Sequence, residues 1–280
     1  MLELPEVEAI AERLRLALTS ARVSSVHLER AAAFRTSPEF PATRLFDLAS
    51  TRVTSVSRYG RDLVLGFDSG TFLGIGFGAA GWAELNPAPL TSPETLLLFE
   101  FESNRLRFCE PLESSRAAIM LGIDPRSLLN IAELGPDPLS PNFDLKRLRS
   151  LLRRRTRSLR RFLTDQSSIA GLGPATADEI LFEARLSPLA ATVALRSEET
   201  IRLHLAIKKV LQTLLLAYRS LPAGTIPDLH SRPPLNVHRL QGRPCRHCGT
   251  TIQAVREGRA VASYCPSCQT RGIVLADRQR

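Results

Sequence analysis

No stretch of this 280-residue chain approaches the ~20 consecutive apolar residues that a membrane-spanning helix needs. No basic leader with an apolar run precedes Leu4, so we expect no secretory signal peptide. Internal repeats and low-complexity tracts are also absent from the sequence. These absences predict a cytoplasmic globular protein without membrane contact.

Cysteine is scarce. Four of the five cysteines lie between Cys245 and Cys268, and Cys109 stands alone. This clustering fits a metal site in a reducing compartment better than a disulfide scaffold. Cys109 is expected to be a small buried hydrophobic residue.

Acidic residues are outnumbered, with 28 Asp and Glu against 37 Lys and Arg, which gives a net charge of +9. Many soluble proteins are basic without binding nucleic acid. Whether this chain binds a polyanion must therefore be judged from where its basic residues lie. Nine of the Lys and Arg residues lie between Lys146 and Arg161, interleaved with leucines. A solvated helix face usually mixes charges of both signs, whereas Asp144 is the only nearby acid before Asp165. The pattern therefore favours a basic helix that contacts phosphates.

The N-terminal half alternates between one helix and many strands. From Leu4 the sequence LPEVEAIAERLRLAL places Pro5 in a first helical turn and repeats apolar residues at helical spacing. From Val23 to about Met120, short runs rich in Val, Leu and Phe predict strands, and DSG after Phe67 predicts a hairpin turn.

The C-terminal half reads as helical. The Pro-rich stretch ELGPDPLSPNF predicts a domain boundary. DQSSIAGLGPATADEILFEARLSP then predicts a helix, a tight turn and a second helix that begins at Pro174, and a further helix is expected from Ser197 to about Tyr218. We predict three segments: 1–132, a β-rich N-terminal domain; 133–222, a helical domain that carries the basic segment; and 223–280, a loop with the cysteine module.

The two CxxC pairs predict one structural zinc ion bound by Cys245, Cys248, Cys265 and Cys268. The sixteen residues between the pairs suit a β-hairpin between two metal-binding knuckles. Four thiolates at tetrahedral spacing select zinc and leave no open coordination position. His247 is an alternative ligand within the first knuckle, but the regular CxxC pairs favour four cysteines.

Three motifs in the same order, ELPEVE, DQSSIAGLGPATADEILFEARLSP and PCRHCGTT with YCPSCQ, resemble the formamidopyrimidine-DNA glycosylase and endonuclease VIII family. The resemblance implies an α+β fold: an N-terminal β-sandwich flanked by helices, a helix-two-turns-helix domain and a C-terminal zinc-finger hairpin. It also implies a DNA repair protein that holds damaged or abasic duplex DNA in a cleft and flips the lesion. The resemblance makes residues 1–132 a domain of catalytic type and residues 133–222 a DNA-binding domain. We expect such a protein to be a monomer and, in a bacterium, to associate with the nucleoid.

The resemblance implies catalytic roles for Leu2, Glu3 and Arg61. In the family the initiator Met is removed and proline attacks the sugar carbon to form a Schiff base, while the adjacent glutamate, here Glu3, handles protons. Leu2 stands at the proline position and should leave Met1 in place, which moves the free amine outward by up to ~3.8 Å. Arg61 stands at a lysine that assists strand cleavage, and a guanidinium cannot readily shuttle a proton.

The resemblance also implies a DNA-binding surface, although several of its side chains are substituted. The DNA contacts that we expect come from Arg154, Arg157, Arg160, Arg161, Gly171, Gly173, Pro174 and Arg259. Pro174 replaces an asparagine of the turn, and Arg259 lies one position from the family's arginine. The family's HLGM segment aligns with Gly76 to Ala79. That segment and a second one fill the gap left by the flipped base. The second segment aligns with RLRFC, in which Phe108 is retained and Leu106 replaces an arginine.

Three functions remain open at this stage. The chain is a bifunctional glycosylase and abasic-site lyase that uses the amine of Leu2 or Met1 with Glu3 as acid and base. Alternatively, it binds damaged or structured DNA without cutting it. Phosphate binding needs only positive charge and backbone geometry, so it does not depend on the substituted catalytic residues. In the third reading it is a monofunctional glycosylase in which Glu3 activates water.

Overall fold

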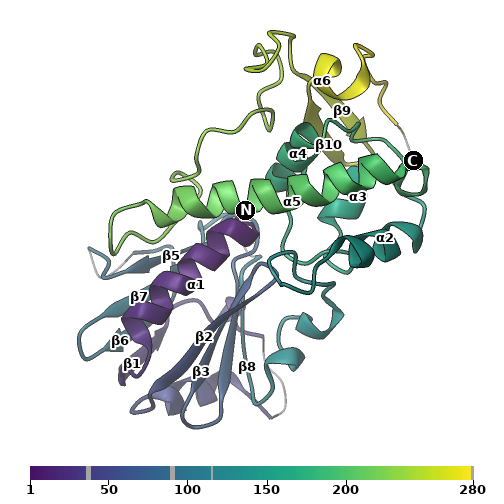
Figure 1. Ribbon diagram of the computed structural model, residues 1–280. Coiled ribbons are helices and arrows are strands. Elements are labelled where there is room, and N and C mark those ends of the chain that lie inside the picture. The colour runs from purple at the N-terminus through teal and green to yellow at the C-terminus, as the bar shows by residue number, and fades with distance from the viewer. Residues whose placement is uncertain (36–38, 89–91, 115, 279–280) are drawn as a thin grey trace. The chain divides into compact units, whose positions relative to one another are not determined.

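A computed structural model describes residues 1–35, 39–88, 92–114 and 116–278 (Figure 1). The chain forms two compact units. Unit 1 comprises Met1–Leu134 and Ala217–Arg232, and unit 2 comprises Gly135–Leu216 and Pro233–Arg280. The division of the sequence at residues 132 and 222 stays a prediction. Among the described helices, none has the length and apolar character to cross a membrane.

Unit 1 begins with helix α1 (Leu4–Leu18), as the sequence predicts. Pro5 lies in its first turn, where a missing N–H costs nothing. Glu3 is the N-cap: its side chain accepts from the backbone N–H of Glu6, and the Glu6 side chain accepts from the N–H of Glu3. This capping box fixes the start of the chain to the first helical turn.

Two antiparallel four-stranded sheets form the predicted β-sandwich. Their strands are β1 (Val23–Leu28), β2 (Val53–Tyr59), β3 (Asp62–Phe67), β4 (Phe72–Gly76), β5 (Trp82–Leu85), β6 (Thr95–Phe101), β7 (Arg105–Cys109) and β8 (Ala118–Gly122). One sheet has the order β1-β6-β7-β5 and the other β2-β3-β4-β8. The predicted hairpin joins β3 to β4, with Gly70 in the left-handed region at φ 78°.

The core of unit 1 lies between the two sheets and under α1. Val7, Ile10 and Leu14 of α1 are fully buried there. Phe67 of one sheet stacks on Phe99 of the other, with ring centroids 6.3 Å apart. Unit 1 also contains the short 3-10 helices η1 (Ala31–Ala33), η2 (Ala42–Leu48), η3 (Pro125–Ser127) and η4 (Ile131–Glu133).

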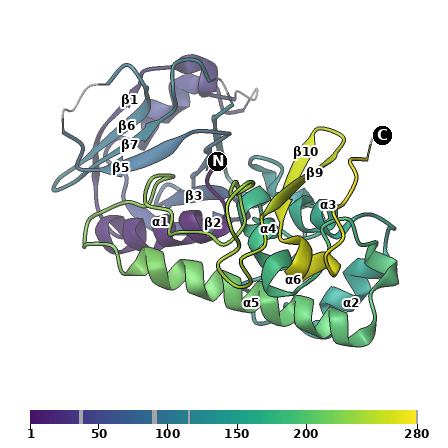
Figure 2. The ribbon, with the colours of Figure 1, turned by 90° about the horizontal axis from the view of Figure 1, so that it is seen from above.

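Unit 2 is helical with one hairpin (Figure 2). Its elements are α2 (Leu145–Arg153), α3 (Leu159–Thr164), α4 (Pro174–Glu183), η5 (Thr192–Ala194), α5 (Ser197–Arg219, whose last three residues belong to unit 1), β9 (Gln253–Glu257), β10 (Ala260–Tyr264) and α6 (Pro266–Thr270). As predicted, Pro174 begins α4 after a turn, and the hairpin lies between the two cysteine pairs.

The prediction of one continuous basic helix over Lys146 to Arg161 is wrong. Helix α2 ends at Arg153, and α3 begins only at Leu159. Ser158 caps α3 by accepting from the backbone N–H of Arg161. The serine N-cap favours this break, because a capping residue has an extended and not a helical backbone.

Candidate functional site

Four cysteines of unit 2 form a site suited to one structural zinc ion. The Sγ atoms of Cys245, Cys248, Cys265 and Cys268 all lie within 4.8 Å of one another. Ligands at ~2.3 Å around tetrahedral zinc are separated by about 3.8 Å, so the four thiols match this geometry. His247 does not belong to the group, which supports the all-cysteine prediction. The thiols would hold the metal at the base of the β9–β10 hairpin.

A cavity of about 320 Å³ opens beside the first residue of the chain in unit 1. It is lined by Met1, Leu2, Arg35, Arg61, Asp62, Gly76, Phe77, Gly78, Ala79, Arg116, Ala118, Leu129 and Asn130. Three arginines against one aspartate make this lining positive, which suits a phosphate-bearing ligand. We call this cavity the N-terminal pocket.

Met1 is held at this pocket from two sides. Arg61 Nη1 donates to Met1 Sδ at 2.8 Å. Arg232 Nη2 donates to the Met1 carbonyl oxygen at 3.3 Å. Burial lowers the pKa of Arg61, and the negative charges of Glu3 and Asp62 oppose that change. Both cations therefore restrain the residue that carries the α-amine.

Beneath Met1, Glu6 accepts hydrogen bonds from two side chains of the 217–232 segment. Tyr218 Oη donates to Glu6 Oε1 at 2.9 Å, and Arg232 Nε donates to the same oxygen at 2.7 Å. Burial would lower the pKa of Arg232, but the charges of Glu6 and Glu3 outweigh it and raise that pKa. Burial and the adjacent Glu6 charge also raise the pKa of Tyr218, which keeps its hydroxyl protonated as a donor.

Leu2 and Glu3 are both buried. The Leu2 side chain is 1% exposed and belongs to the core of unit 1. Glu3 is 2% exposed, and its carboxylate caps α1. Glu3 is not among the described residues that line the N-terminal pocket, whereas Arg61 is.

The wall of the pocket at Leu129 and Asn130 has an unusual backbone. Their φ values are 51° and 61°, so two successive residues other than glycine adopt the left-handed region. Such a conformation costs of the order of 1 kcal/mol at each residue and concentrates at functional sites. The segment lies against β3, because Leu128 and Ile131 pack on Val64.

The sequence contains only three lysines, Lys146, Lys208 and Lys209. All three belong to unit 2. Unit 1 therefore carries one primary amine, the α-amine of Met1, if the initiator is retained. This distribution matters because imine formation requires a primary or secondary amine.

The segment aligned with the family's HLGM lies in the N-terminal pocket, because Gly76, Phe77, Gly78 and Ala79 all line it. The gap-filling role that the resemblance implies for Phe108 is wrong, and Leu106, which replaces an arginine in the same segment, is buried with it. Phe108 is 1% exposed and Leu106 is fully buried, and both belong to the sandwich core. Since they are interior residues of β7, neither side chain is available to fill a gap in a duplex.

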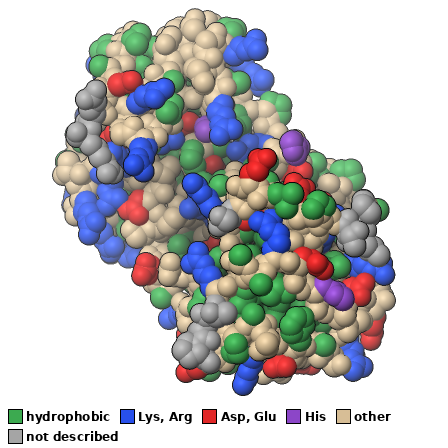
Figure 3. Space-filling view, turned by 180° about the vertical axis from the view of Figure 1, so that it is seen from behind, with side chains coloured by type: hydrophobic (Ala, Val, Ile, Leu, Met, Phe, Trp, Pro, Cys, Tyr) green, Lys and Arg blue, Asp and Glu red, His purple; other side chains and the backbone are tan. Residues whose placement is uncertain are grey.

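The structure brings together three predicted DNA-contacting arginines, from the segment before α3, from α3 and from the turn of the β9–β10 hairpin. Arg157, Arg161 and Arg259 line one hollow of unit 2 with Asp165 and Glu257. Arg161 Nε lies 3.3 Å from Glu257 Oε2, and Arg157 pairs with Asp165. Lys and Arg side chains on the face in Figure 3 are likewise mixed with acidic ones rather than gathered in one continuous patch.

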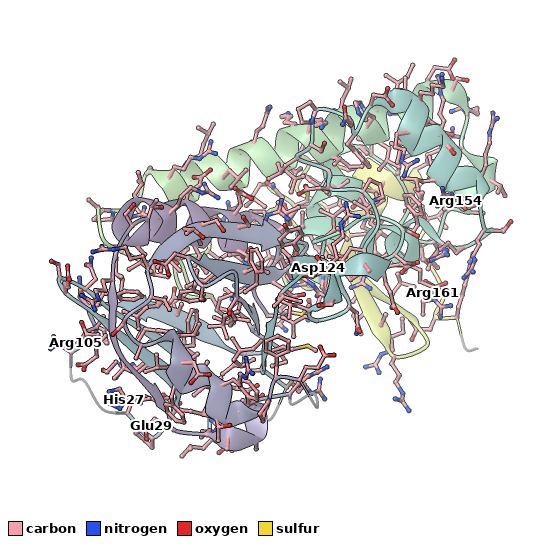
Figure 4. The ribbon with its side chains drawn as sticks, turned by 90° about the horizontal axis from the view of Figure 1, so that it is seen from below. His27, Glu29, Arg105, Asp124, Arg154 and Arg161 are labelled. Atoms are coloured by element: carbon pink, nitrogen blue, oxygen red, sulfur yellow. The ribbon has the colours of Figure 1, made fainter. Side chains whose placement is uncertain are left out.

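Arg160 and Arg154 differ in their surroundings. Arg160 is 5% exposed, and its Nε lies 3.1 Å from Asp178 Oδ1. A phosphate contact does not fit this buried ion pair, so we assign Arg160 a structural role. Arg154 is exposed at the end of α2 (Figure 4), and Arg161 extends from α3 in the same unit.

The predicted turn is present at Gly171, Gly173 and Pro174. Gly171 has φ 85°, and its N–H donates to Gln166 Oε1 at 2.8 Å. Gly173 is the N-cap of α4, and Pro174 is its first residue. Gln166 also donates to the Leu172 carbonyl, so its side chain holds the turn closed.

Two buried acids of α4 connect the helices of unit 2 to the hairpin. Glu179 accepts from the backbone N–H groups of residues 236, 237 and 238. Asp178 accepts from Arg160, from His238 Nδ1 and from the backbone N–H of Ser263 on β10. These bonds fix the zinc-binding hairpin to α4, and sequence reasoning missed them.

Sequence reasoning also missed four charged residues around Met1. Arg35, Asp62 and Arg116 line the N-terminal pocket, and Arg232 holds the Met1 carbonyl. Asp62 follows Arg61 directly and could have been noticed there. The other three lie on segments far apart in the sequence, where no local pattern marks them.

Three family models match most of the chain. Residues 1–116 match the formamidopyrimidine-DNA glycosylase N-terminal domain, residues 134–219 match the formamidopyrimidine-DNA glycosylase H2TH domain, and residues 242–271 match the zinc finger found in FPG and IleRS.

Individual proteins match over nearly their whole length. The chain is 31% identical to formamidopyrimidine-DNA glycosylase of Desulforamulus reducens, with 96% of this chain and 99% of that protein covered. Identity to the Thermus thermophilus enzyme is 32%, covering 97% and 100%. The crystal structure of the Thermus thermophilus MutM (FPG) protein matches with a TM-score of 0.80 at 28% identity, covering 95% and 98%. Lactococcus lactis Fpg in complex with DNA that contains an abasic site shares the fold, with a TM-score of 0.83 at 23% identity and coverage of 96% and 99%.

Proposed function

Because this chain belongs to the formamidopyrimidine-DNA glycosylase family, we propose that it is a cytoplasmic DNA repair protein that binds damaged or abasic duplex DNA as a monomer. We further propose that it cleaves the strand at abasic sites through an imine with the α-amine of Met1. One observation carries this proposal: the only primary amine of unit 1 belongs to a residue that lines the N-terminal pocket.

The proposed reaction forms an imine with the sugar, as in the family, but uses the α-amine of Met1 in place of a proline nitrogen. Leu2 cannot supply the nucleophile while Met1 remains, because its nitrogen is then an amide. A free α-amine has a pKa near ~7.7, so a substantial fraction is deprotonated at neutral pH. Arg61 and Arg232 restrain Met1, which supports a fixed position for that amine. Glu3 holds the first turn, and Arg61 offers positive charge for a phosphate.

DNA contacts are proposed for exposed or half-buried arginines of unit 2. Arg154, Arg157, Arg161 and Arg259 carry cationic side chains at or near the surface, and Arg161 and Arg259 border one hollow. The turn from Gly171 to Pro174 is proposed to approach the backbone of the nucleic acid. Phosphate contacts of this kind position the duplex without reading its sequence.

A non-catalytic DNA-binding function is the second candidate. It is favoured by Leu2, which stands at the family's nucleophile position with its side chain in the core. The water-activating role of Glu3 has less support, because that carboxylate is buried and caps α1.

Borohydride trapping on a duplex with one abasic site tests the proposal. We expect a covalent complex and strand cleavage, both lost when the N-terminus is extended by a short tag. Tight binding with no trapping and no cleavage would support the non-catalytic function instead. Base release without trapping, abolished in Glu3→Gln, would support the route through water.

A further inference from the structure

Asp62 is the first residue of β3. In the register of the sheet it stands opposite Gly76 of β4. Because side chains alternate along a strand, Asp62 lies on the same face as Val64, the face that Leu128 and Ile131 cover. Its side chain therefore lies outside the sandwich core, on the side of the N-terminal pocket.

Gly76 leaves room for the carboxylate. A Cβ added at Gly76 would lie 3.1 Å from Asp62 Oδ1 and 3.8 Å from Ala118 Cβ. The Asp62 carboxylate thus lies over the backbone of Gly76. A side chain at position 76 would take up part of this space. Asp62, Gly76 and Met1 all line the same cavity.

Three arginines from separate segments line the cavity with Asp62. Arg61 directly precedes β3, Arg35 follows η1, and Arg116 precedes β8; the charges of Arg61 and Arg35 act on the Asp62 carboxyl. Glu3, at the start of α1, acts on Arg61. Burial raises the pKa of the Asp62 carboxyl to about 6, against the opposing charges of Arg61 and Arg35. Near neutral pH the group is therefore a carboxylate that accepts a proton more readily than an ordinary aspartate.

We propose that Asp62 is the catalytic base that removes the C2′ proton of the abasic-site sugar after the Met1 amine has formed an imine at C1′. This inference rests on the proposed lyase function. Arg61 and Glu3 fit the role of this base less well. Arg61 stays protonated, and Glu3 is buried in the cap of α1 and does not line the cavity.

The electrons balance without a further reactant. The α-amine adds to the C1′ aldehyde and water leaves, which gives a protonated imine. Asp62 takes the C2′ proton, and the electron pair of that C–H bond moves toward the imine carbon to give an enamine. The enamine pair then forms the C2′=C3′ bond, the C3′–O bond breaks, and the phosphate departs with that bond's electron pair. Water hydrolyses the imine and frees the amine.

Two steps of this scheme separate experimentally. Borohydride traps the imine before elimination, whereas strand cleavage requires elimination. The Met1 amine governs the first step, and Asp62 is required only for the second. A variant at Asp62 should therefore keep trapping and lose cleavage.

The test compares Asp62→Asn and Asp62→Glu with Asp47→Asn, a control at an exposed aspartate of η2. Single-turnover cleavage and trapping of an abasic duplex are measured from pH 5 to 9. We expect Asp62→Asn to slow cleavage by about 10²-fold or more while trapping changes by less than about threefold. Asp62→Glu should restore part of the cleavage with a shifted pH midpoint, and Asp47→Asn should match the wild type.

Cleavage by Asp62→Asn at the wild-type rate with an unchanged pH profile would overturn the assignment of Asp62. Loss of trapping together with cleavage in a folded Asp62→Asn protein would also overturn it, because Asp62 would then act before elimination. If Asp62→Asn does not fold, an unshifted pH midpoint in Asp62→Glu overturns the assignment. Absence of trapping in the wild type would instead overturn the proposed lyase function itself.

Discussion

Arg232 and Glu6, 226 residues apart in the sequence, form an ion pair beside the first residue of the chain, with the Glu6 carboxylate buried and Arg232 half-buried. The pair ties the 217–232 segment to α1 and places Arg232 within reach of the Met1 carbonyl. The N-terminus is thus positioned by the segment that completes unit 1 as well as by its own helix.

Replacing Arg232 with Met should destabilise the protein by about 3 kcal/mol, because it leaves the Glu6 carboxylate buried without its counter-ion. Urea denaturation measures this change as a lower midpoint. A second Arg–Glu pair provides the matched control. Arg219 Nε, at the end of α5, donates to Glu12 Oε2 of α1 at 2.9 Å, and the Arg219 side chain is exposed. Arg219→Met should cost less than about 1 kcal/mol. Equal effects at the two sites would contradict the role of burial.

The sequence predicts those elements and sites whose determining residues lie close together along the chain. Pro5 and the apolar spacing of α1 predict that helix correctly, since caps and periodicity lie within a few residues of one another. The four cysteines likewise predict the metal site through spacing alone. The break between α2 and α3 was not predicted, because the helical periodicity of the sequence continues through the N-cap at Ser158.

Tertiary partners account for the remaining differences. Arg160 looks like its charged neighbours in sequence, and only the buried Asp178 of α4 turns it inward. The N-terminal pocket joins Met1, Arg35, Arg116 and Asn130, which sheet pairing and loop geometry bring together from separate segments. A single sequence contains no pattern that links such residues.

Removal of the metal should release the hairpin of unit 2. Cys248→Ser is expected to lower the zinc content from about one ion per chain to near zero and to weaken DNA binding. Metal analysis with a chelating dye measures the first effect. Cys109→Ser is the control, since burial raises the pKa of Cys109 to about 12 and this cysteine lies outside the cluster. Zinc loss in the control, or its retention in Cys248→Ser, would contradict the assignment.

DNA affinity should fall steeply with salt, with a log–log slope near −5 for about five phosphate contacts. Arg154→Gln should weaken binding to all duplexes and reduce the slope by about 1. Arg160→Gln should instead lower stability, because Asp178 would lose its buried cation. Fluorescence anisotropy at several salt concentrations, with a denaturation curve for each variant, distinguishes the two effects. An unchanged slope in Arg154→Gln would exclude that residue from the interface.

The stability contribution of Asp62 should depend on pH. Its pKa in the folded state, about 6, lies above the ordinary value. Its contribution is therefore full below pH ~4 and is lost as the pH rises through about 6. Relative to the wild type, Asp62→Asn should thus gain on the order of 1 kcal/mol between pH 4 and pH 8, after allowance for solvent screening. Thermal denaturation at both pH values measures the difference, and a gain in the opposite direction would contradict the burial of the charge.

The identity of the reacting nitrogen tests the central claim most directly. Peptide mapping by mass spectrometry of the borohydride-reduced complex locates the sugar remnant on the chain. We predict that it is attached to the α-amine of a retained Met1. Attachment to Lys146, Lys208 or Lys209, or to the nitrogen of Leu2 after loss of Met1, would contradict the account.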